Sequence, residues 1–256
     1  MASRLALGGS EASHLRAFTG IEDMSTSTAY NRWRNHLKGE TAALPLPISA
    51  AGAGTAGDGL PLELLLLLQF DGGSRGNPGP AGSGSVVYQL ITASATSFPS
   101  SASSSLYRIG NALYKKRELW RSFTYLGDNV TNNVAEYTGL LGCVSSLKDL
   151  LSEIEVGAAV ETRVKVRVEG DSQLVIRQLT GEYKVKNASL KQIYDQVKAH
   201  INDVLGLDSK KKKIFAVHFE YSHVPRELNG VADALSNEAM DLRRSHSDRS
   251  NSIILL

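Results

Sequence analysis

Four acidic residues stand at positions from which their carboxylates could meet in one site. Asp71 ends the apolar run LLLLLQF, and Asp171 ends the alternating segment RVKVRVEG. Glu136 lies in the first turn of a predicted helix, and Asp233 lies in the last predicted helix. In a parallel α/β sheet, the carboxyl end of a strand and a neighbouring helix turn border the same crevice. Converging carboxylates repel one another unless cations neutralise them, and oxygen-only ligation favours Mg²⁺ or Mn²⁺ over zinc.

Each acid also has a structural interpretation, which would be preferred if the residue stood alone. Asp71 could be a turn residue, and Asp171 could cap the helix that follows it. Glu136 lies three residues after Asn133 and could complete a capping box with it. Asp233 could be a solvated helix residue. The metal-site hypothesis therefore depends on the four acids occurring together.

The glycine-rich segment after Asp71, GGSRGNPGPAG, raises the alternative of a phosphate-binding loop. A Walker loop needs a Lys-Ser or Lys-Thr pair after its last glycine, and none follows here. A dinucleotide-binding loop opens a helix, whereas Gly82-Ser-Gly84 leads into another predicted strand. Neither alternative fits the context.

The predicted elements follow an order typical of a mixed α/β domain. Three strands, at 63–70, 82–92 and 118–126, come first and predict an antiparallel meander. A helix that Asn133 could cap follows, and strands and helices alternate from there to a final helix, LNGVADALSNEAMDLRR. The order βββαβααβα predicts a five-stranded mixed sheet, with three antiparallel and then parallel strands, flanked by helices.

Composition gives weaker indications. Apolar residues make up 42% of the 256 residues, enough for a core, and the net charge of +2 does not by itself indicate a nucleic-acid partner. The one cysteine, Cys143, excludes an intrachain disulfide and predicts buried packing at its helical position. We expect no membrane span, no disulfide partner and a monomer.

The ends of the chain lack the periodicity of the centre. We expect residues 1–60 to be a low-complexity extension, disordered or targeting, followed by a domain at 61–245 and a tail at 246–256. The expected location is intracellular, in the nucleus or cytoplasm. An organelle is the alternative if residues 1–60 include a transit peptide, a reading that the acidic residues there weaken.

Four segments together resemble the signatures of one family. In order and spacing, FDGGSRGNPGPAG, TNNVAEY, EGDSQLV and SHVPRELNGVADALS resemble those of type 1 ribonuclease H, over about residues 64–242. GEYKVKN and HVPRE are similar to its compact form, without a basic protrusion. The resemblance implies a ribonuclease H-like fold and an endonuclease that cuts the RNA strand of an RNA/DNA hybrid, leaving 5′-phosphate and 3′-hydroxyl ends.

The resemblance also implies roles for individual residues. The four acids would bind two Mg²⁺ ions, with Mn²⁺ possible, in a two-metal mechanism. His223 matches a mobile histidine that assists proton transfer or product release. Hybrid contacts would come from Gly72, Asn77, Thr131, Asn132, Asn133, Gln173, Lys184 and Lys186. The two lysines could equally lie on a solvated turn, and the Ser-rich insertion at 94–110 is longer than is usual in the family.

Two further interpretations stay open. A catalytically weak nucleic-acid-binding module of the same fold is the alternative to an active enzyme, although a complete set of four acids argues against it. An origin from the ribonuclease H domain of a reverse transcriptase would imply the same chemistry.

Overall fold

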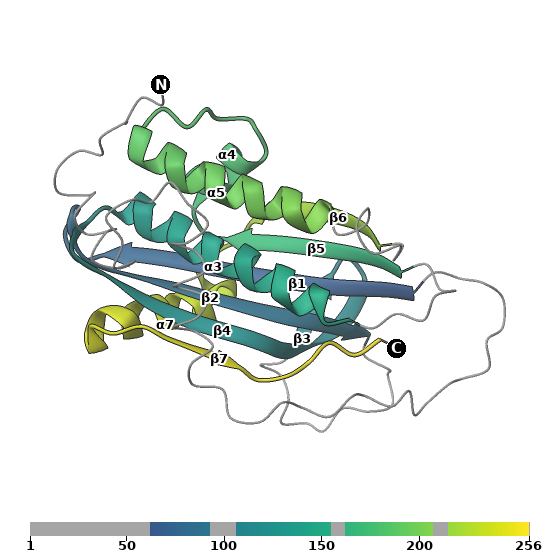
Figure 1. Ribbon diagram of the computed structural model, residues 1–256. Helices are drawn as coiled ribbons and strands as arrows, with labels where there is room; N and C mark the ends of the chain where they lie inside the picture. Colours follow the sequence, from purple (N-terminus) through teal and green to yellow (C-terminus); the bar gives the residue numbers. More distant parts are fainter. Residues whose placement is uncertain (1–61, 93–105, 155–161, 207–214, 256) are drawn as a thin grey trace, which may run out of the picture.

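Four stretches of the chain are described by the computed structural model: residues 62–92, 106–154, 162–206 and 215–255. Figure 1 draws them in colour. The expected extension at 1–60, and the insertion at 94–110 up to residue 105, lie outside the described residues. No helix within the described stretches is long and apolar enough to cross a membrane.

One mixed sheet lies at the centre of the described fold, with the strand order β3-β4-β2-β1-β5-β6 and with β7 added on β4. β1, β2 and β4 pair antiparallel, while β5 and β6 extend the sheet from β1 by parallel pairing. The strands are β1 (Leu62–Ser74), β2 (Gly79–Thr92), β3 (Leu106–Ile109), β4 (Ala112–Val130), β5 (Thr162–Gly170), β6 (Phe215–His223) and β7 (His246–Arg249).

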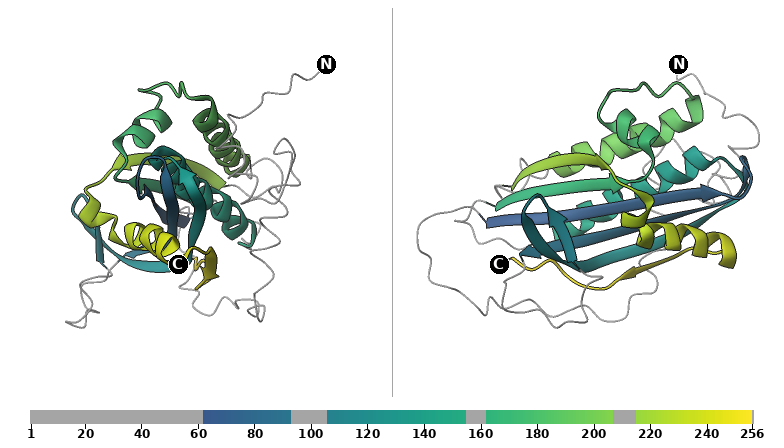
Figure 2. Two further views of the ribbon diagram at one scale, coloured as in Figure 1. Left: turned by 90° about the vertical axis from the view of Figure 1, so that its left-hand side faces the viewer. Right: turned by 180° about the vertical axis from the view of Figure 1, so that it is seen from behind.

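Helices cover both faces of this sheet. One face carries α3 (Asn132–Ser152), α4 (Gln173–Leu179) and α5 (Ala188–Leu205), and the other carries α7 (Gly230–Leu242), which follows the short 3-10 helix η2 (Arg226–Leu228) (Figures 1 and 2).

Adjacent residues of β2 show the two faces directly. Ser85 Oγ donates a hydrogen bond to Gly139 O of α3 at 2.7 Å. A Cβ atom at Gly84 would instead lie 2.1 Å from Ala232 O of α7. Because neighbouring residues of a strand point to opposite faces, α3 and α7 pack on opposite sides of β2.

Two hydrophobic clusters explain why β1 is apolar almost without interruption. Leu66, Leu68 and Phe70 are buried in the cluster that includes α3 and α5. Leu67 is buried in the other cluster, with Val86 of β2 and with residues of α7. A central strand that is buried on both faces needs apolar side chains at consecutive positions, as parallel sheets show. Cys143 is also fully buried, as expected.

The predicted order and mixed sheet are confirmed, with differences in detail. The third predicted strand, 118–126, is the middle of the longer β4. The sheet has two short strands beyond the five predicted, β3 and β7, each of four residues. β7 falls in the segment expected to be a tail, and it pairs with residues 120–123 of β4. Its sequence, HSDR, has no apolar residue, so only the partner strand makes it a strand.

The start of α3 corrects a second detail. Thr131, not Asn133, occupies the N-cap position, and its side chain makes no capping hydrogen bond. The helix begins at Asn132, so Glu136 lies in its second turn and not in its first. Glu136 is buried at this position.

Candidate metal centre

Asp71 lies within β1, not in a turn, and its side chain is only 7% exposed. Ser236 Oγ of α7 donates a hydrogen bond to Asp71 Oδ2. Burial raises the pKa of Asp71 to about 6, opposed by the bond from Ser236 and supported by the charges of Asp171 and Asp233. The fold thus holds this carboxyl group where its negative charge is poorly stabilised.

Glu136 reaches the same place from α3. Its side chain is 6% exposed, and Oε2 has no hydrogen-bond partner among the residues that the structure describes. Burial, with the neighbouring charges of Asp71 and Asp171, raises the pKa of Glu136 to about 9. Its burial in the second turn also excludes the capping-box interpretation. A buried polar atom without a partner is rare in proteins and calls for an explanation such as a bound ion.

Asp171 follows β5 directly, and its side chain is half-buried. Ser172, not Asp171, is the N-cap of α4, so the capping interpretation of Asp171 is wrong. Asn229 Nδ2 donates to Asp171 Oδ1 at 3.0 Å and also to Phe70 O at 2.8 Å. Asn229 itself is fully buried, so it ties the start of α7 to both β1 and β5.

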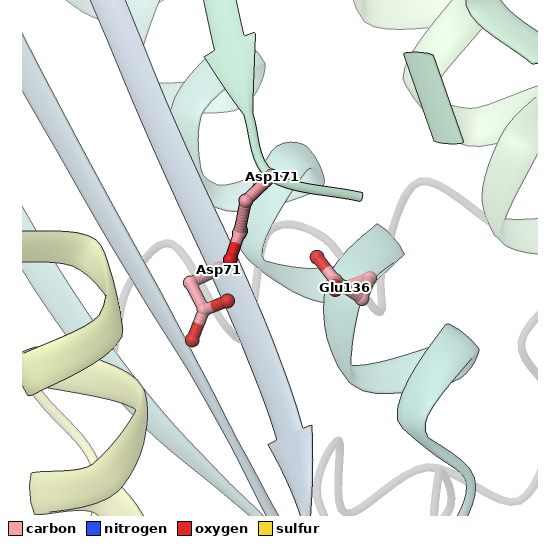
Figure 3. Close-up of side chains that lie close together, drawn as sticks. All are labelled: Asp71, Glu136 and Asp171. Carbon is pink, nitrogen blue, oxygen red and sulfur yellow. The ribbon is translucent and has the colours of Figure 1, made fainter. Parts of the chain in front are cut away.

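The three carboxyl groups converge, as Figure 3 shows. Each of Asp71, Glu136 and Asp171 offers one oxygen, and these oxygens all lie within 4.8 Å of one another. The sheet makes this possible because β1 and β5 are parallel neighbours and end at the same edge. Three carboxylate oxygens at this spacing could hold a metal ion, and Glu136 Oε2 has no hydrogen-bond partner among the described residues.

Asp233, the fourth predicted ligand, stands beside this group without belonging to it. It lies in the first turn of α7 and forms an ion pair with Arg226 of η2 through Oδ1. It is close enough for its charge to raise the pKa of Asp71. The structure therefore brings three of the four acids together and pairs the fourth with an arginine.

His223 ends β6 at the same edge of the sheet. The imidazole is exposed, and its Nε2 lies 3.2 Å from the backbone oxygen of Asp171. The ring is therefore next to the carboxylate cluster and open to solvent.

The predicted contact residues of the first turn and of α3 also lie close together. Asn77 Oδ1 accepts a hydrogen bond from the backbone N–H of Asn132 at 3.2 Å. Thr131, Asn132 and Asn133 are half-buried at the start of α3, three to five residues before Glu136. These residues form one surface next to the metal centre.

Gly72 has a packing role that the sequence did not predict. A Cβ atom there would lie 2.1 Å from Ala135 C and from Glu136 N. Only glycine lets α3 approach β1 this closely, and this approach delivers Glu136 to the cluster. Whether Gly72 also contacts a nucleic acid stays a prediction.

The remaining predicted contacts are exposed and farther along the chain. Gln173 is the first residue of α4, and Lys184 and Lys186 lie between α4 and α5. Near them, Arg177 stacks over Tyr183, with the guanidinium carbon 5.2 Å from the ring centroid. The structure places these side chains in solvent and does not connect them to the carboxylate cluster.

Three residues of the site were not predicted from the sequence: Ser236, Asn229 and Arg226. All three lie in the segment SHVPRELNGVADALS, which drew attention only for its histidine and Asp233. Ser236 follows Asp233 by three residues and so lies on the same side of α7, a spacing that could have indicated it. Asn229 makes its contacts with distant strands and leaves no local pattern.

Sequence comparisons identify relatives of this domain. The family model described as "Reverse transcriptase-like" matches residues 117–239. The "Bifunctional protein Rv2228c" of Mycobacterium tuberculosis is 35% identical over 174 residues, which are 68% of this chain and 35% of that protein. The "Ribonuclease HI" of Halobacterium salinarum is 32% identical over 176 residues, 67% of this chain and 62% of that protein. The chain thus spans about a third of the mycobacterial relative and under two thirds of the archaeal one.

Solved structures give related matches. The N-terminal RNase H domain of Rv2228c, solved as a fusion with maltose binding protein, is 32% identical, with 69% of this chain and 99% of that chain covered and a TM-score of 0.44. LC11-RNase H1 in complex with an RNA/DNA hybrid is 30% identical, with 70% and 98% covered and a TM-score of 0.45.

The described domain has the mixed α/β architecture of the ribonuclease H-like fold. The described domain is a ribonuclease H-like domain, and its homologues include type 1 ribonucleases H. This kinship and the acidic cluster together support a ribonuclease H-like nuclease.

Proposed function

We propose that this chain is an endoribonuclease that hydrolyses the RNA strand of RNA/DNA hybrids and leaves 5′-phosphate and 3′-hydroxyl ends. The observation that carries the proposal is the cluster of Asp71, Glu136 and Asp171, two buried and one half-buried, in a domain related to type 1 ribonucleases H. The relative LC11-RNase H1 was solved with such a hybrid, which supports the same substrate class here.

The cluster fits divalent cations. Raised pKa values at Asp71 and Glu136, both caused mainly by burial, mean that the protein alone stabilises the ionised forms of these carboxyl groups poorly, even with the charge of Arg226 acting on Glu136. Two Mg²⁺ ions, or Mn²⁺, would be held by these carboxylates and Asp171, with Asp233 as the fourth ligand once it leaves Arg226. When bound, such ions supply Lewis-acid stabilisation of the charge that develops on the scissile phosphate.

The side chains of the protein have roles beyond holding metal. Ser236 and Asn229 hold the carboxyl groups of Asp71 and Asp171 in fixed orientations by donating hydrogen bonds to them. His223, exposed and next to Asp171 O, is placed to accept or donate a proton at its imidazole nitrogens during turnover.

The hybrid would lie across the surface beside the cluster. We propose that Gly72, Asn77 and residues 131–133 contact it at the start of α3, because this surface adjoins the carboxylates. Contacts in the minor groove would detect the RNA 2′-hydroxyl groups. The remaining proposed contacts are Gln173, Lys184 and Lys186, the lysines as phosphate contacts.

A cleavage assay tests this proposal. The full chain is incubated with an RNA/DNA hybrid labelled on either strand, with Mg²⁺ or with EDTA, beside RNA and DNA duplexes of the same sequence. We expect cleavage of the RNA strand of the hybrid alone, only with Mg²⁺, and its loss in Asp71→Asn. An intact hybrid, or equal cleavage by the variant, would refute the enzyme. Binding of the hybrid without product would favour the alternative, a nucleic-acid-binding module.

A further inference from the structure

Two buried polar residues, Gln69 and Glu169, lie next to the carboxylate cluster on the central strands. Gln69 and Glu169 are paired across the β1–β5 ladder, two residues before Asp71 and Asp171 respectively. Each is 1% exposed. Because side chains two residues apart in a strand point to the same face, Gln69 and Asp71 share one face of the sheet, while Asp171 lies just beyond the end of β5.

Glu169 is the centre of a network that reaches three other strands. Tyr107 of β3 donates a hydrogen bond to Glu169 Oε1, and Arg167 Nε donates to the same oxygen at 2.7 Å. Arg167 Nη2 in turn donates to Ser222 Oγ of β6 at 3.1 Å. The other carboxylate oxygen, Oε2, accepts from Gln69 Nε2 at 3.2 Å. Both oxygens of Glu169 are therefore engaged.

Further hydrogen bonds link Gln69 to the carboxylate cluster. The same Nε2 atom donates a second hydrogen bond to Leu228 O at 3.0 Å. The next residue, Asn229, donates its side-chain amide to Phe70 O and to Asp171 Oδ1. One fixed path thus runs from Glu169 through Gln69 and the backbone at 228–229 to the carboxyl group of Asp171.

Stability alone is a poor explanation for this arrangement. An ion pair between the half-buried Arg167 and the buried Glu169 often contributes no more than apolar side chains of similar size would, because the buried charge loses water. Leu228 is 61% exposed, so the turn that carries Asn229 has little apolar packing to hold it. Local backbone hydrogen bonds hold the turn itself, from Leu228 N to Pro225 O and from Asn229 N to Arg226 O, and the bond from Gln69 to Leu228 O ties its backbone to β1.

We propose that Gln69 and Glu169 are positioning residues, which hold the turn at 228–229 so that Asn229 orients Asp171 toward a divalent cation. The proposal rests on the function proposed above and adds two residues that touch neither the cation nor the substrate. Residues that orient metal ligands typically change metal affinity by 10- to 100-fold when they are replaced.

Two variants break the path at different points with little change in volume. Gln69→Leu removes both hydrogen bonds donated by Nε2. Glu169→Gln keeps an acceptor for Tyr107 and Arg167 but turns an amide N–H₂ toward Gln69 Nε2, so that two donors face each other. Tyr107→Phe is the matched control, because it removes a bond to Glu169 and leaves the path through Gln69 intact.

The readout is Mg²⁺ binding, measured by calorimetry with MgCl₂ and no nucleic acid, at a temperature well below each unfolding midpoint. We expect Gln69→Leu and Glu169→Gln each to weaken Mg²⁺ binding by about 10-fold or more, and Tyr107→Phe to stay within about twofold of the wild type. In the hybrid assay, the first two variants should lower kcat and leave KM for the hybrid almost unchanged.

The outcomes separate this proposal from the proposed function. Unchanged Mg²⁺ affinity in the folded Gln69→Leu and Glu169→Gln proteins would overturn the positioning role, as would an equal loss in Tyr107→Phe. A wild type without measurable Mg²⁺ binding would overturn it too. A wild type that binds Mg²⁺ but leaves the hybrid intact would refute the nuclease, while the binding data would still decide the roles of Gln69 and Glu169.

Discussion

Changing Asp71 to Asn should stabilise the protein when no divalent cation is present. Burial raises the pKa of Asp71 from 3.8 to about 6. The folded state then binds this proton more tightly than the unfolded chain, so stability decreases as the pH rises from about 3.8 to about 6. A shift of this size corresponds to about 3 kcal/mol lost above that range. Asparagine carries no charge and can still accept the hydrogen bond from Ser236 Oγ.

The assay is urea denaturation in EDTA over a range of pH. At about pH 7.5 we expect Asp71→Asn to be more stable than the wild type by up to about 3 kcal/mol, and the difference should shrink as the pH falls toward about 4. Adding Mg²⁺ should stabilise the wild type and reverse the order, because a ligand of the folded state shifts the equilibrium toward it.

A matched control is Asp195→Asn on α5, where the carboxylate is exposed and paired with Lys191. This change should alter the free energy of unfolding by no more than about 0.5 kcal/mol. If Asp71→Asn is no more stable than the wild type in EDTA at about pH 7.5, burial of the ionised Asp71 carboxylate does not destabilise the folded state, and the prediction is wrong.

Three further predictions concern packing, orientation and proton transfer. Gly72→Ala should destabilise the protein by about 3 kcal/mol, measured by urea denaturation, because the new Cβ would lie 2.1 Å from Ala135 C. Gly230→Ala, where a Cβ meets nothing within 4 Å, should change stability by less than about 1 kcal/mol. Asn229→Ala should cost about 2 kcal/mol in the same measurement, and weaken Mg²⁺ binding in calorimetry, through loss of its two donated hydrogen bonds. His223→Ala should lower the single-turnover cleavage rate about 10-fold or more with unchanged hybrid affinity, and an unchanged rate would exclude a role in proton transfer.

Much of the fold could be predicted because it follows from local patterns. The unbroken apolar run of β1 indicates a central strand, and Val alternating with charged residues in β5 indicates a strand with one covered face. β7 could not be predicted in this way. HSDR becomes a strand only because β4 offers an open edge beside it, and pairing over such a distance leaves no trace in a four-residue segment.

The candidate site was likewise predictable from the sequence only in part. Asp71 and Asp171 were predictable because Asp71 follows the apolar run of β1 and Asp171 directly follows β5, and neighbouring parallel strands run toward one edge. The burial of Glu136 could not be predicted from the sequence, because it depends on the close approach of α3 to β1 that Gly72 allows. The ion pair between Asp233 and Arg226 was missed as well, because it depends on how η2 turns into α7.

The proposed function requires Asp71, Glu136 and Asp171 to hold the divalent cation on which hydrolysis depends. The most direct measurement is anomalous diffraction from crystals of the protein soaked in Mn²⁺. We predict an anomalous peak within coordination distance of oxygens from all three carboxylates, about 2.0–2.5 Å as for hard cations with oxygen ligands. Crystals soaked at saturating Mn²⁺ that show no peak there, or a peak only elsewhere, would contradict the claim.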